Sequence, residues 1–203
     1  DWNLQAGGKY YVIRNGSSII AFRIPAKEWK GFQIMASHSD SPAFKIKENP
    51  EMEAAHCIKL NVEKYGGMIC APWFDRPLSI AGRLVVSEGS RLVSKLVNVD
   101  RDLVMIPNLA IHMNRQVNDG YTYNAQKDML PVFGSLEAKG TFMSLMAEAA
   151  GVKEEDILGH DLFLYNRQPG TIWGADETFL SCGRLDDLQC AFSSVKAVFE
   201  GEN

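Results

Sequence analysis

Apolar and polar residues alternate in short runs along the first part of the chain, a pattern that favours strands. Residues 10–13 and 18–24 are rich in β-branched and aromatic side chains, and Asn15-Gly16 lies between them. Asn-Gly suits a tight hairpin turn because both residues tolerate a positive φ. The sequence therefore predicts that the chain opens with a β-hairpin.

A largely apolar run at residues 31–38 follows the predicted hairpin. Such a run is typical of a strand that is buried on both faces of a covered sheet. Pro42 stops the run, because proline cannot donate to a strand ladder. We therefore expect residues 31–38 to form a core strand of an α/β domain.

Beyond Pro42 the pattern changes to short strands that are punctuated by glycine-containing turns, with two helices later in the chain. The predicted strands span residues 44–46, 58–62, 68–71, 79–86, 92–99, 161–165 and 178–181. Apolar residues three or four positions apart predict one helix over residues 136–151 and a second from about Asp187. The chain therefore combines a β-rich segment with helices.

These changes of pattern set the expected domain boundaries. Residues 1–45 form the first part of a core domain, residues 46–160 a β-rich insertion, and residues 161–203 the second part of the core. The predicted fold class is α/β, with a mixed-sheet core that the β-rich insertion interrupts.

The composition limits the classes of binding partner and the cellular compartment that are expected. The chain has 203 residues, 46% hydrophobic content and a net charge of -4, so it can bury a core and has no basic excess for nucleic acid or an anionic membrane. No apolar stretch approaches the ~20 residues of a bilayer span. Four cysteines without a close CxxC pair are typical of reduced thiols, so we expect a cytoplasmic location. The chain begins at Asp1 rather than at Met, and a fragment of a longer protein is expected.

Candidate chemistry begins at the end of the apolar run, in the segment Ala36-Ser37-His38-Ser39-Asp40-Ser41-Pro42. In an extended chain, side chains two positions apart share a face, so His38 and Asp40 are expected to point into one space. One interpretation is a metal site in which His38 is a ligand and Asp40 orients it or acts in catalysis. The alternative is an ordinary surface turn, because Ser, Asp and Pro are common turn formers.

A second acidic cluster, Arg184-Leu185-Asp186-Asp187-Leu188, lies between a predicted strand and the last helix. Enzymes built on sheets commonly bind ligands at such strand ends. Asp187 is placed to cap the helix by accepting hydrogen bonds from first-turn amides. That role leaves Asp186 as the candidate metal ligand.

Four sequence motifs stand out along the chain: His38-Ser39-Asp40-Ser41-Pro42, Trp73-Phe74-Asp75-Arg76-Pro77-Leu78-Ser79, Ile106-Pro107-Asn108-Leu109-Ala110-Ile111-His112 and Arg184-Leu185-Asp186-Asp187-Leu188. They occur in the order found in the aspartyl aminopeptidase family, which the chain resembles over nearly its whole length. The opening Gly7-Gly8-Lys9-Tyr10-Tyr11 and Arg14-Asn15-Gly16-Ser17-Ser18 are also similar to that family. Four motifs in the same order are far more specific than any one of them.

The resemblance implies a cytosolic dizinc exopeptidase that removes single residues, acidic ones among the candidates, from the N-termini of peptide substrates. In that family the histidine matching His38 binds one zinc, the aspartate matching Asp186 bridges both zinc ions, and the acid matching Asp40 is the catalytic aspartate. Two zinc ions about 4 Å apart need a bridging carboxylate, and together they activate water and polarise the scissile carbonyl.

His112 follows the apolar residues 109–111, and by itself such a histidine is more often packed or hydrogen-bonded. The resemblance implies a different role, in which the matching histidine reaches a neighbouring subunit's active site and stabilises the developing oxyanion. That role implies a homo-oligomer, based on dimers and extending to a dodecamer, with residues 46–160 as the oligomerisation domain. His56 and His160 match no site motif of the family and are interpreted as structural or exposed.

The family's complete site contains further residues downstream of the bridging aspartate: a Glu-Glu pair, whose first member is the general base, and one more Asp and His. The residues after Asp187 contain neither such a pair nor a histidine. The chain is therefore expected to carry part of the site and to be inactive alone. The alternative is a noncatalytic module that serves oligomer assembly. Trp73-Phe74-Asp75-Arg76 is interpreted as a buried, salt-linked turn.

Overall fold

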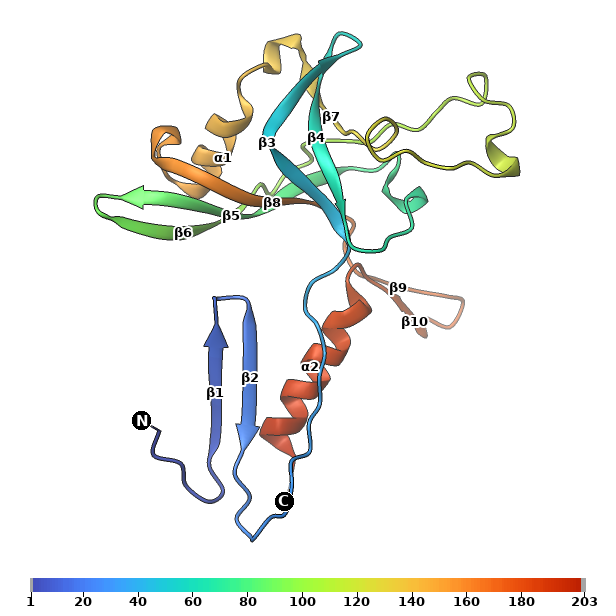
Figure 1. Ribbon diagram of the computed structural model, residues 1–203. Coiled ribbons are helices and arrows are strands. Elements are labelled where there is room, and N and C mark those ends of the chain that lie inside the picture. Colours follow the sequence, from blue (N-terminus) through green and yellow to red (C-terminus); the bar gives the residue numbers. More distant parts are fainter. Residues whose placement is uncertain (1, 202–203) are drawn as a thin grey trace. The chain divides into compact units, whose positions relative to one another are not determined.

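The computed structural model describes residues 2–201, which divide into two compact units (Figure 1). The first unit comprises Asp1–Ser41 and Arg184–Asn203, and the second comprises Pro42–Gly183. The chain therefore leaves the first unit once and returns to it once.

The first unit opens with the predicted hairpin. Strands β1 (Lys9–Arg14) and β2 (Ser18–Arg23) pair antiparallel. Asn15 and Gly16 have φ angles of 52° and 67°, which is the left-handed conformation that the tight turn requires. The hairpin prediction is confirmed.

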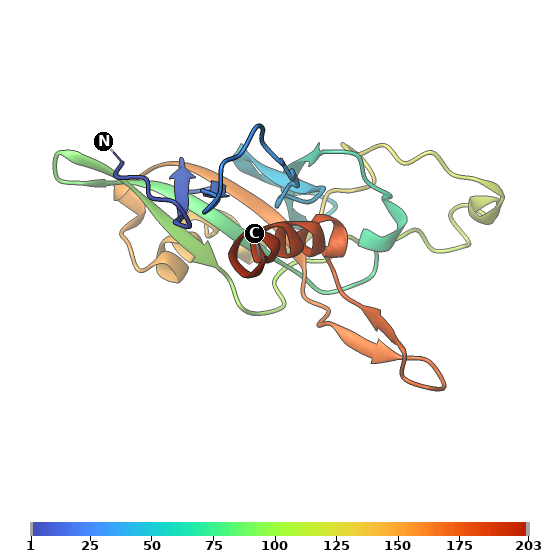
Figure 2. The same ribbon diagram turned by 90° about the horizontal axis from the view of Figure 1, so that it is seen from below.

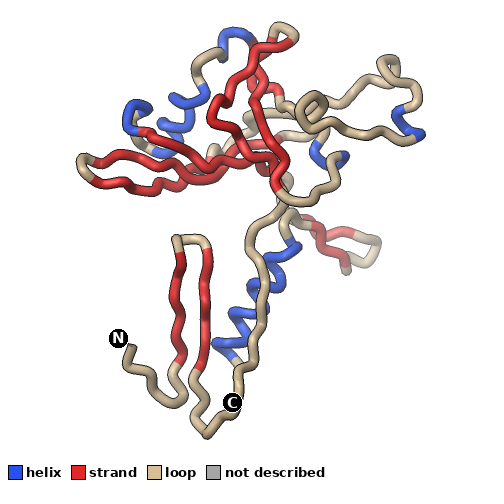
Figure 3. Tube along the Cα trace, viewed as in Figure 1, coloured by secondary structure: helices blue, strands red, loops and turns tan. Residues whose placement is uncertain are grey.

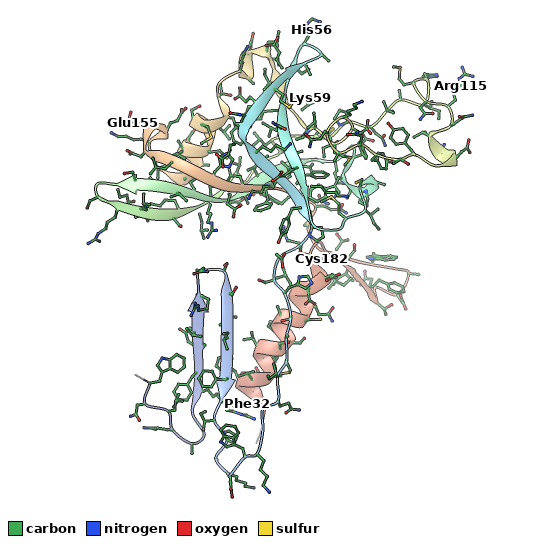
Figure 4. The ribbon with its side chains drawn as sticks, in the orientation of Figure 1. Phe32, His56, Lys59, Arg115, Glu155 and Cys182 are labelled. Atoms are coloured by element: carbon green, nitrogen blue, oxygen red, sulfur yellow. The ribbon has the colours of Figure 1, made fainter. Side chains whose placement is uncertain are left out.

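The apolar segment that precedes the first motif is not the buried strand that its sequence predicts. Residues 32–41 have no regular secondary structure (Figure 3). Phe32, which is labelled in Figure 4, is 82% exposed, and Ile34 is 83% exposed. The prediction is wrong because a strand needs a hydrogen-bonded neighbour, and no strand in the described part of the chain pairs with this segment.

Helix α2 (Leu185–Glu200) completes the first unit and confirms the predicted second helix. Asp186 and Asp187 have non-helical dihedral angles and are joined by a cis peptide bond, so the regular helix begins after them. The helix packs against β2, and the Lys9 side chain donates a hydrogen bond to the main-chain carbonyl of Phe199.

The second unit is built on a six-stranded sheet with the order β6-β5-β8-β3-β4-β7, in which neighbouring strands are antiparallel (Figures 1 and 2). Its strands are β3 (Ala43–Ala54), β4 (Cys57–Tyr65), β5 (Leu78–Glu88), β6 (Arg91–Asn98), β7 (Val132–Ser135) and β8 (Ile157–Asn166). Five predicted strands are confirmed here, whereas β7 was not predicted. The run 68–71 is not a strand; it leads into the short 3-10 helix η1 (Ala71–Trp73).

Helix α1 (Phe142–Ala150) is shorter than the predicted helix over residues 136–151, although it ends at Gly151 as expected. The 3-10 helix η3 (Leu136–Ala138) replaces its first turn. The carboxylate of Glu51, on β3, accepts hydrogen bonds from the main-chain N–H groups of Gly140 at 2.6 Å and Phe142 at 2.9 Å. A residue distant in sequence therefore sets where this helix begins.

The hydrophobic core lies within the second unit. Its largest fully buried side chains are Phe44, Phe142, Ile46, Ile58, Leu60, Leu78, Ile80, Leu84, Ile106, Met129, Met146 and Leu162. Among the described residues of the first unit, every side chain is at least partly exposed.

A second small hairpin, β9 (Thr171–Trp173) and β10 (Phe179–Ser181), follows the sheet, with the rings of Trp173 and Phe179 stacked at 4.9 Å. The predicted strand at 178–181 is confirmed. The remaining short helices are η2 (Val117–Asp119) and η4 (Glu154–Asp156). The chain is thus a mixed α/β protein with a central antiparallel sheet. Over residues 2–201, the helices lack the length and apolar character of a bilayer span.

Candidate metal centre

The candidate metal centre lies in the first unit, where the loop that carries His38 meets the start of α2. The main-chain N–H of His38 donates to Oδ2 of Asp187 at 3.0 Å across 149 sequence positions. The hydroxyl of Ser41 donates to the main-chain carbonyl of Asp186 at 3.3 Å. Two sequence clusters that are distant along the chain are therefore held side by side.

The two ring nitrogens of His38 face different partners. Nδ1 lies 3.0 Å from the main-chain carbonyl oxygen of Asp40 and 3.3 Å from its Oδ1. Nε2 lies 3.5 Å from Oδ1 of Asp186 and 3.8 Å from Oδ2 of Asp187. A hydrogen bond from Nδ1–H favours the tautomer whose Nε2 lone pair is available to a metal. The ring nitrogen that this tautomer leaves unprotonated is therefore the one that faces Asp186.

The acidic side chains of the cluster differ in exposure. The side chain of Asp186 is 94% exposed, that of Asp40 60%, and that of Asp187 16%. His38, Asp186 and Asp187 each offer a ligand atom within 4.8 Å of the others. Imidazole nitrogen and carboxylate oxygen are zinc ligands. The residues present therefore fit a zinc ion, and Asp186 offers the accessible carboxylate.

Hydrogen bonds and charges shift the pKa values in this cluster. The pKa of Asp187 is lowered because the Cys190 thiol and the His38 N–H donate to its carboxylate, and the pKa of Cys190 is raised by the same hydrogen bond. The pKa of His38 is raised, first by its hydrogen bond to the Asp40 carbonyl and then by the surrounding carboxylates. The helix cap expected at Asp187 is not among the hydrogen bonds of the described residues; its carboxylate accepts the main-chain N–H of His38 instead.

The sequence pattern did not predict that Cys190 lies beside Asp187. The residue lies three positions after Asp187 on α2, the spacing at which helical side chains are neighbours. This spacing in the sequence could have indicated that the two side chains are neighbours, but it does not show which way the Asp187 carboxylate points.

The second and third motifs come together in the second unit. The main-chain N–H of Asp75 donates to the carbonyl of Ile106 at 2.9 Å, and Oδ1 of Asp75 accepts the main-chain N–H of Asn108 at 2.9 Å. The expected salt-linked turn is replaced by these main-chain hydrogen bonds, because the Asp75 carboxylate reaches the next motif. Arg76 reaches Oε1 of Gln168 at 3.5 Å.

The remaining histidines lie in the second unit. His112 is exposed in the loop after Ile106, a different unit from that of His38, Asp40 and Asp186. His56 is exposed at the tip of the β3–β4 hairpin (Figure 4). His160 lies on β8 with a side chain only 3% exposed. His56 is thus exposed, and His160 is packed within the sheet.

The chain is thus a mixed α/β protein in which a histidine and two carboxylates offer ligand atoms within 4.8 Å of one another. Over residues 1–203 the sequence matches the family model described as aminopeptidase I zinc metalloprotease (M18). The chain therefore belongs to the M18 family, which confirms the resemblance seen in the motifs.

Curated relatives are similar along nearly the whole chain. The probable M18 family aminopeptidase 2 of Clostridium acetobutylicum is 46% identical over 206 residues, covering 97% of this chain and 48% of that protein. The protein of the same name from Stutzerimonas stutzeri is 37% identical over 207 residues, covering 98% and 48%. The chain spans about half the length of the curated relatives it matches.

Solved structures share the fold. The cryo-EM structure of the Ape4 and Nbr1 complex matches with a TM-score of 0.89 at 33% identity, over 98% of this chain and 43% of that chain. Chaetomium thermophilum mApe1 matches with a TM-score of 0.87 at 30% identity, over 98% and 49%. The S. cerevisiae mApe1 dodecamer matches with a TM-score of 0.75 at 29% identity, over 94% and 44%.

Proposed function

We propose that this chain is part of a zinc-dependent aminopeptidase in which His38 and Asp186 are metal ligands. The observation that carries the proposal is the 3.5 Å approach of His38 Nε2 to Asp186 Oδ1. The two residues come from separate family motifs in a chain that belongs to a zinc metalloprotease family. In the complete site two zinc ions would activate a water molecule and polarise the scissile carbonyl of a peptide.

The chain's own residues have distinct tasks in this proposal. Asp40 holds the imidazole of His38 through its main-chain carbonyl, with its carboxylate 3.3 Å from Nδ1, and it is proposed as the catalytic aspartate. Asp186 is proposed as the bridging ligand, which its 94% exposed side chain supports because two ions must reach it.

The general base and the remaining ligands are proposed to lie in protein outside this chain. Two observations support this: the chain spans about half the length of its relatives, and the described residues of the first unit leave apolar side chains such as Phe32 and Ile34 exposed. We propose that the first unit is part of a catalytic domain with a mixed sheet. The 203 residues alone are then inactive.

The second unit is proposed as the inserted oligomerisation domain, expected from the sequence over residues 46–160, and His112 as the residue that it contributes to a neighbouring subunit's site. The S. cerevisiae mApe1 dodecamer supports a dimer-based homo-oligomer of up to twelve copies. Peptides with acidic N-terminal residues are the proposed substrates. The four free cysteines support a cytoplasmic location.

The ligand assignment is tested by Asp186→Ala in the protein that contains this chain. We expect the loss of both hydrolysis and bound zinc, measured with aminoacyl reporters and by elemental analysis. Asp119→Ala, which removes an exposed acid from the second unit, is the matched control and keeps both. Unchanged zinc content in Asp186→Ala would contradict the assignment.

A separate assay concerns the 203-residue polypeptide by itself. We expect no release of amino acid from acidic or neutral N-terminal reporters. Release that a chelator abolishes would show that the chain is catalytic alone. Full-length protein that assembles, binds zinc and yet hydrolyses no peptide would favour the noncatalytic assembly module instead.

A further inference from the structure

Asp186 and Asp187 are adjacent in the sequence but differ in their surroundings. The side chain of Asp186 is 94% exposed, whereas that of Asp187 is 16% exposed. Both lie near the same imidazole, since Nε2 of His38 is 3.5 Å from Oδ1 of Asp186 and 3.8 Å from Oδ2 of Asp187. By distance alone, both acids are therefore candidate ligands. They differ in the solvent exposure of their side chains.

The carboxylate of Asp187 already accepts a hydrogen bond. Its Oδ2 accepts the main-chain N–H of His38 at 3.0 Å, and the thiol of Cys190, three residues along α2, is its neighbour. A carboxylate that accepts N–H bonds has less lone-pair capacity left for a metal ion. Its low exposure limits access further.

A second hydrogen bond joins the same two segments and is again donated by residues 38–41. The Ser41 hydroxyl donates to the main-chain carbonyl of Asp186 at 3.3 Å. Residues 38–41 and residues 186–187 are thus joined by two hydrogen bonds, one through a side chain of each segment. The imidazole of His38 and the carboxylate of Asp186, which take no part in these two bonds, approach each other to 3.5 Å.

We propose that Asp187 is a positioning residue and not a zinc ligand: it holds the main chain of His38 so that Nε2 is directed at the zinc position beside Asp186. This proposal rests on the proposed zinc function of His38 and Asp186. The physical reason is that a ligand fixed at its main chain loses little conformational freedom when it binds metal, so the bound state is favoured.

The test compares Asp187→Asn with Asp187→Ala in the full-length protein, because the two roles require different atoms. An amide oxygen still accepts the His38 N–H, but it is neutral and a poor substitute for a ligating carboxylate. If Asp187 positions His38, Asp187→Asn keeps zinc affinity within about threefold, whereas Asp187→Ala lowers it by roughly 10- to 100-fold. Affinity is measured by competition with a chromogenic chelator, and coordination by the visible absorption of the Co²⁺-substituted protein.

Cys190→Ala provides an independent variant, because it removes the thiol beside Asp187 and leaves the proposed ligands in place. We expect a fall in zinc affinity of about threefold, in the same direction as Asp187→Ala. Cys182→Ala is the matched control: Cys182 is an exposed thiol of the second unit (Figure 4), and its loss leaves the affinity unchanged. If Asp187→Ala does not fold, Cys190→Ala decides in its place.

Several results would overturn the proposal. If Asp187→Asn loses as much affinity as Asp187→Ala and alters the Co²⁺ spectrum, the carboxylate is a ligand. If Asp187→Ala folds and binds zinc as the unaltered protein does, or if it does not fold and Cys190→Ala has no effect, Asp187 does not position His38. Failure of the proposed zinc function gives a different result from failure of this positioning proposal. In that case the unaltered protein would bind no zinc, or Asp186→Ala would still bind zinc.

Discussion

The main-chain N–H of Asn108 donates a hydrogen bond to Oδ1 of Asp75 at 2.9 Å. Asp75 adopts a φ of 55° and donates its own N–H to the carbonyl of Ile106. One residue of the second motif therefore binds the main chain of the third motif at two points. These bonds fix the start of the loop that leads to His112.

Replacing Asp75 with alanine is expected to release the start of this loop. Asp75→Ala removes the acceptor for the Asn108 amide, whose hydrogen exchange should become about tenfold faster, as expected for the loss of one hydrogen bond. Asp75→Asn is the control, since asparagine keeps an acceptor oxygen and tolerates a positive φ. Unchanged exchange at Asn108 in Asp75→Ala would show that the carboxylate does not anchor the loop.

The proposed contribution of His112 to a neighbouring subunit predicts complementation. His112→Ala should lower turnover with little change in zinc content or assembly, because the residue is not a proposed ligand. Mixed oligomers of His112→Ala and Asp186→Ala should regain part of the activity, since some sites then combine an intact metal centre with an intact His112. Activity assays on subunits that are mixed and reassembled measure this. If no activity returned, the proposal that neighbouring subunits share an active site would lose its support.

The close approach of β5 and β8 predicts that Gly82 does not tolerate a side chain. Gly82 has a φ of 157°, and an added Cβ would lie 2.1 Å from the carbonyl oxygen of Asp161. Gly82→Ala should therefore destabilise the second unit by roughly 1–3 kcal/mol. Gly159→Ala, on β8, is the control because an added Cβ there has no neighbour within 4 Å. Thermal unfolding followed by circular dichroism compares the two; equal melting temperatures would contradict the expected clash.

Burial of His160 predicts a pH-dependent loss of stability. Desolvation lowers the pKa of its imidazole, while Glu48 and Asp161 oppose the shift and Lys45 adds to it. Below about pH 6.5 the unfolded chain gains a proton that the folded chain does not, so the free energy of unfolding falls as the pH decreases. His160→Leu should remove part of the loss between pH 7.5 and 5.5.

Chemical denaturation at these two pH values measures the effect. His56→Asn is the matched control, because it removes an exposed histidine from a turn position with a φ of 60° that asparagine tolerates. The control should keep the pH dependence of the unaltered chain. If His160→Leu also keeps the pH dependence of the free energy of unfolding, burial of His160 is not its cause.

The pattern of apolar and polar residues predicted helices and strands well where turn-forming residues or helical spacing gave the same indication. Asn15-Gly16 located the first hairpin, and Gly151 marked the end of α1. The pattern failed at residues 31–38, because apolar side chains indicate a tendency to be buried and do not supply a partner strand. It also missed the short strands β7 and β9, whose pairing comes from β4 and β10.

The sequence by itself determined the membership of the M18 family, because the motifs and their order are properties of the chain. It also named His38, Asp40 and Asp186 as candidates for the site. Only the tertiary structure decided that Asp186 is open to solvent while Asp187 turns inward to hold His38. The sequence separated the two adjacent aspartates only by their position before the helix; their different surroundings arise because a segment 149 positions away supplies a hydrogen-bond donor to Asp187.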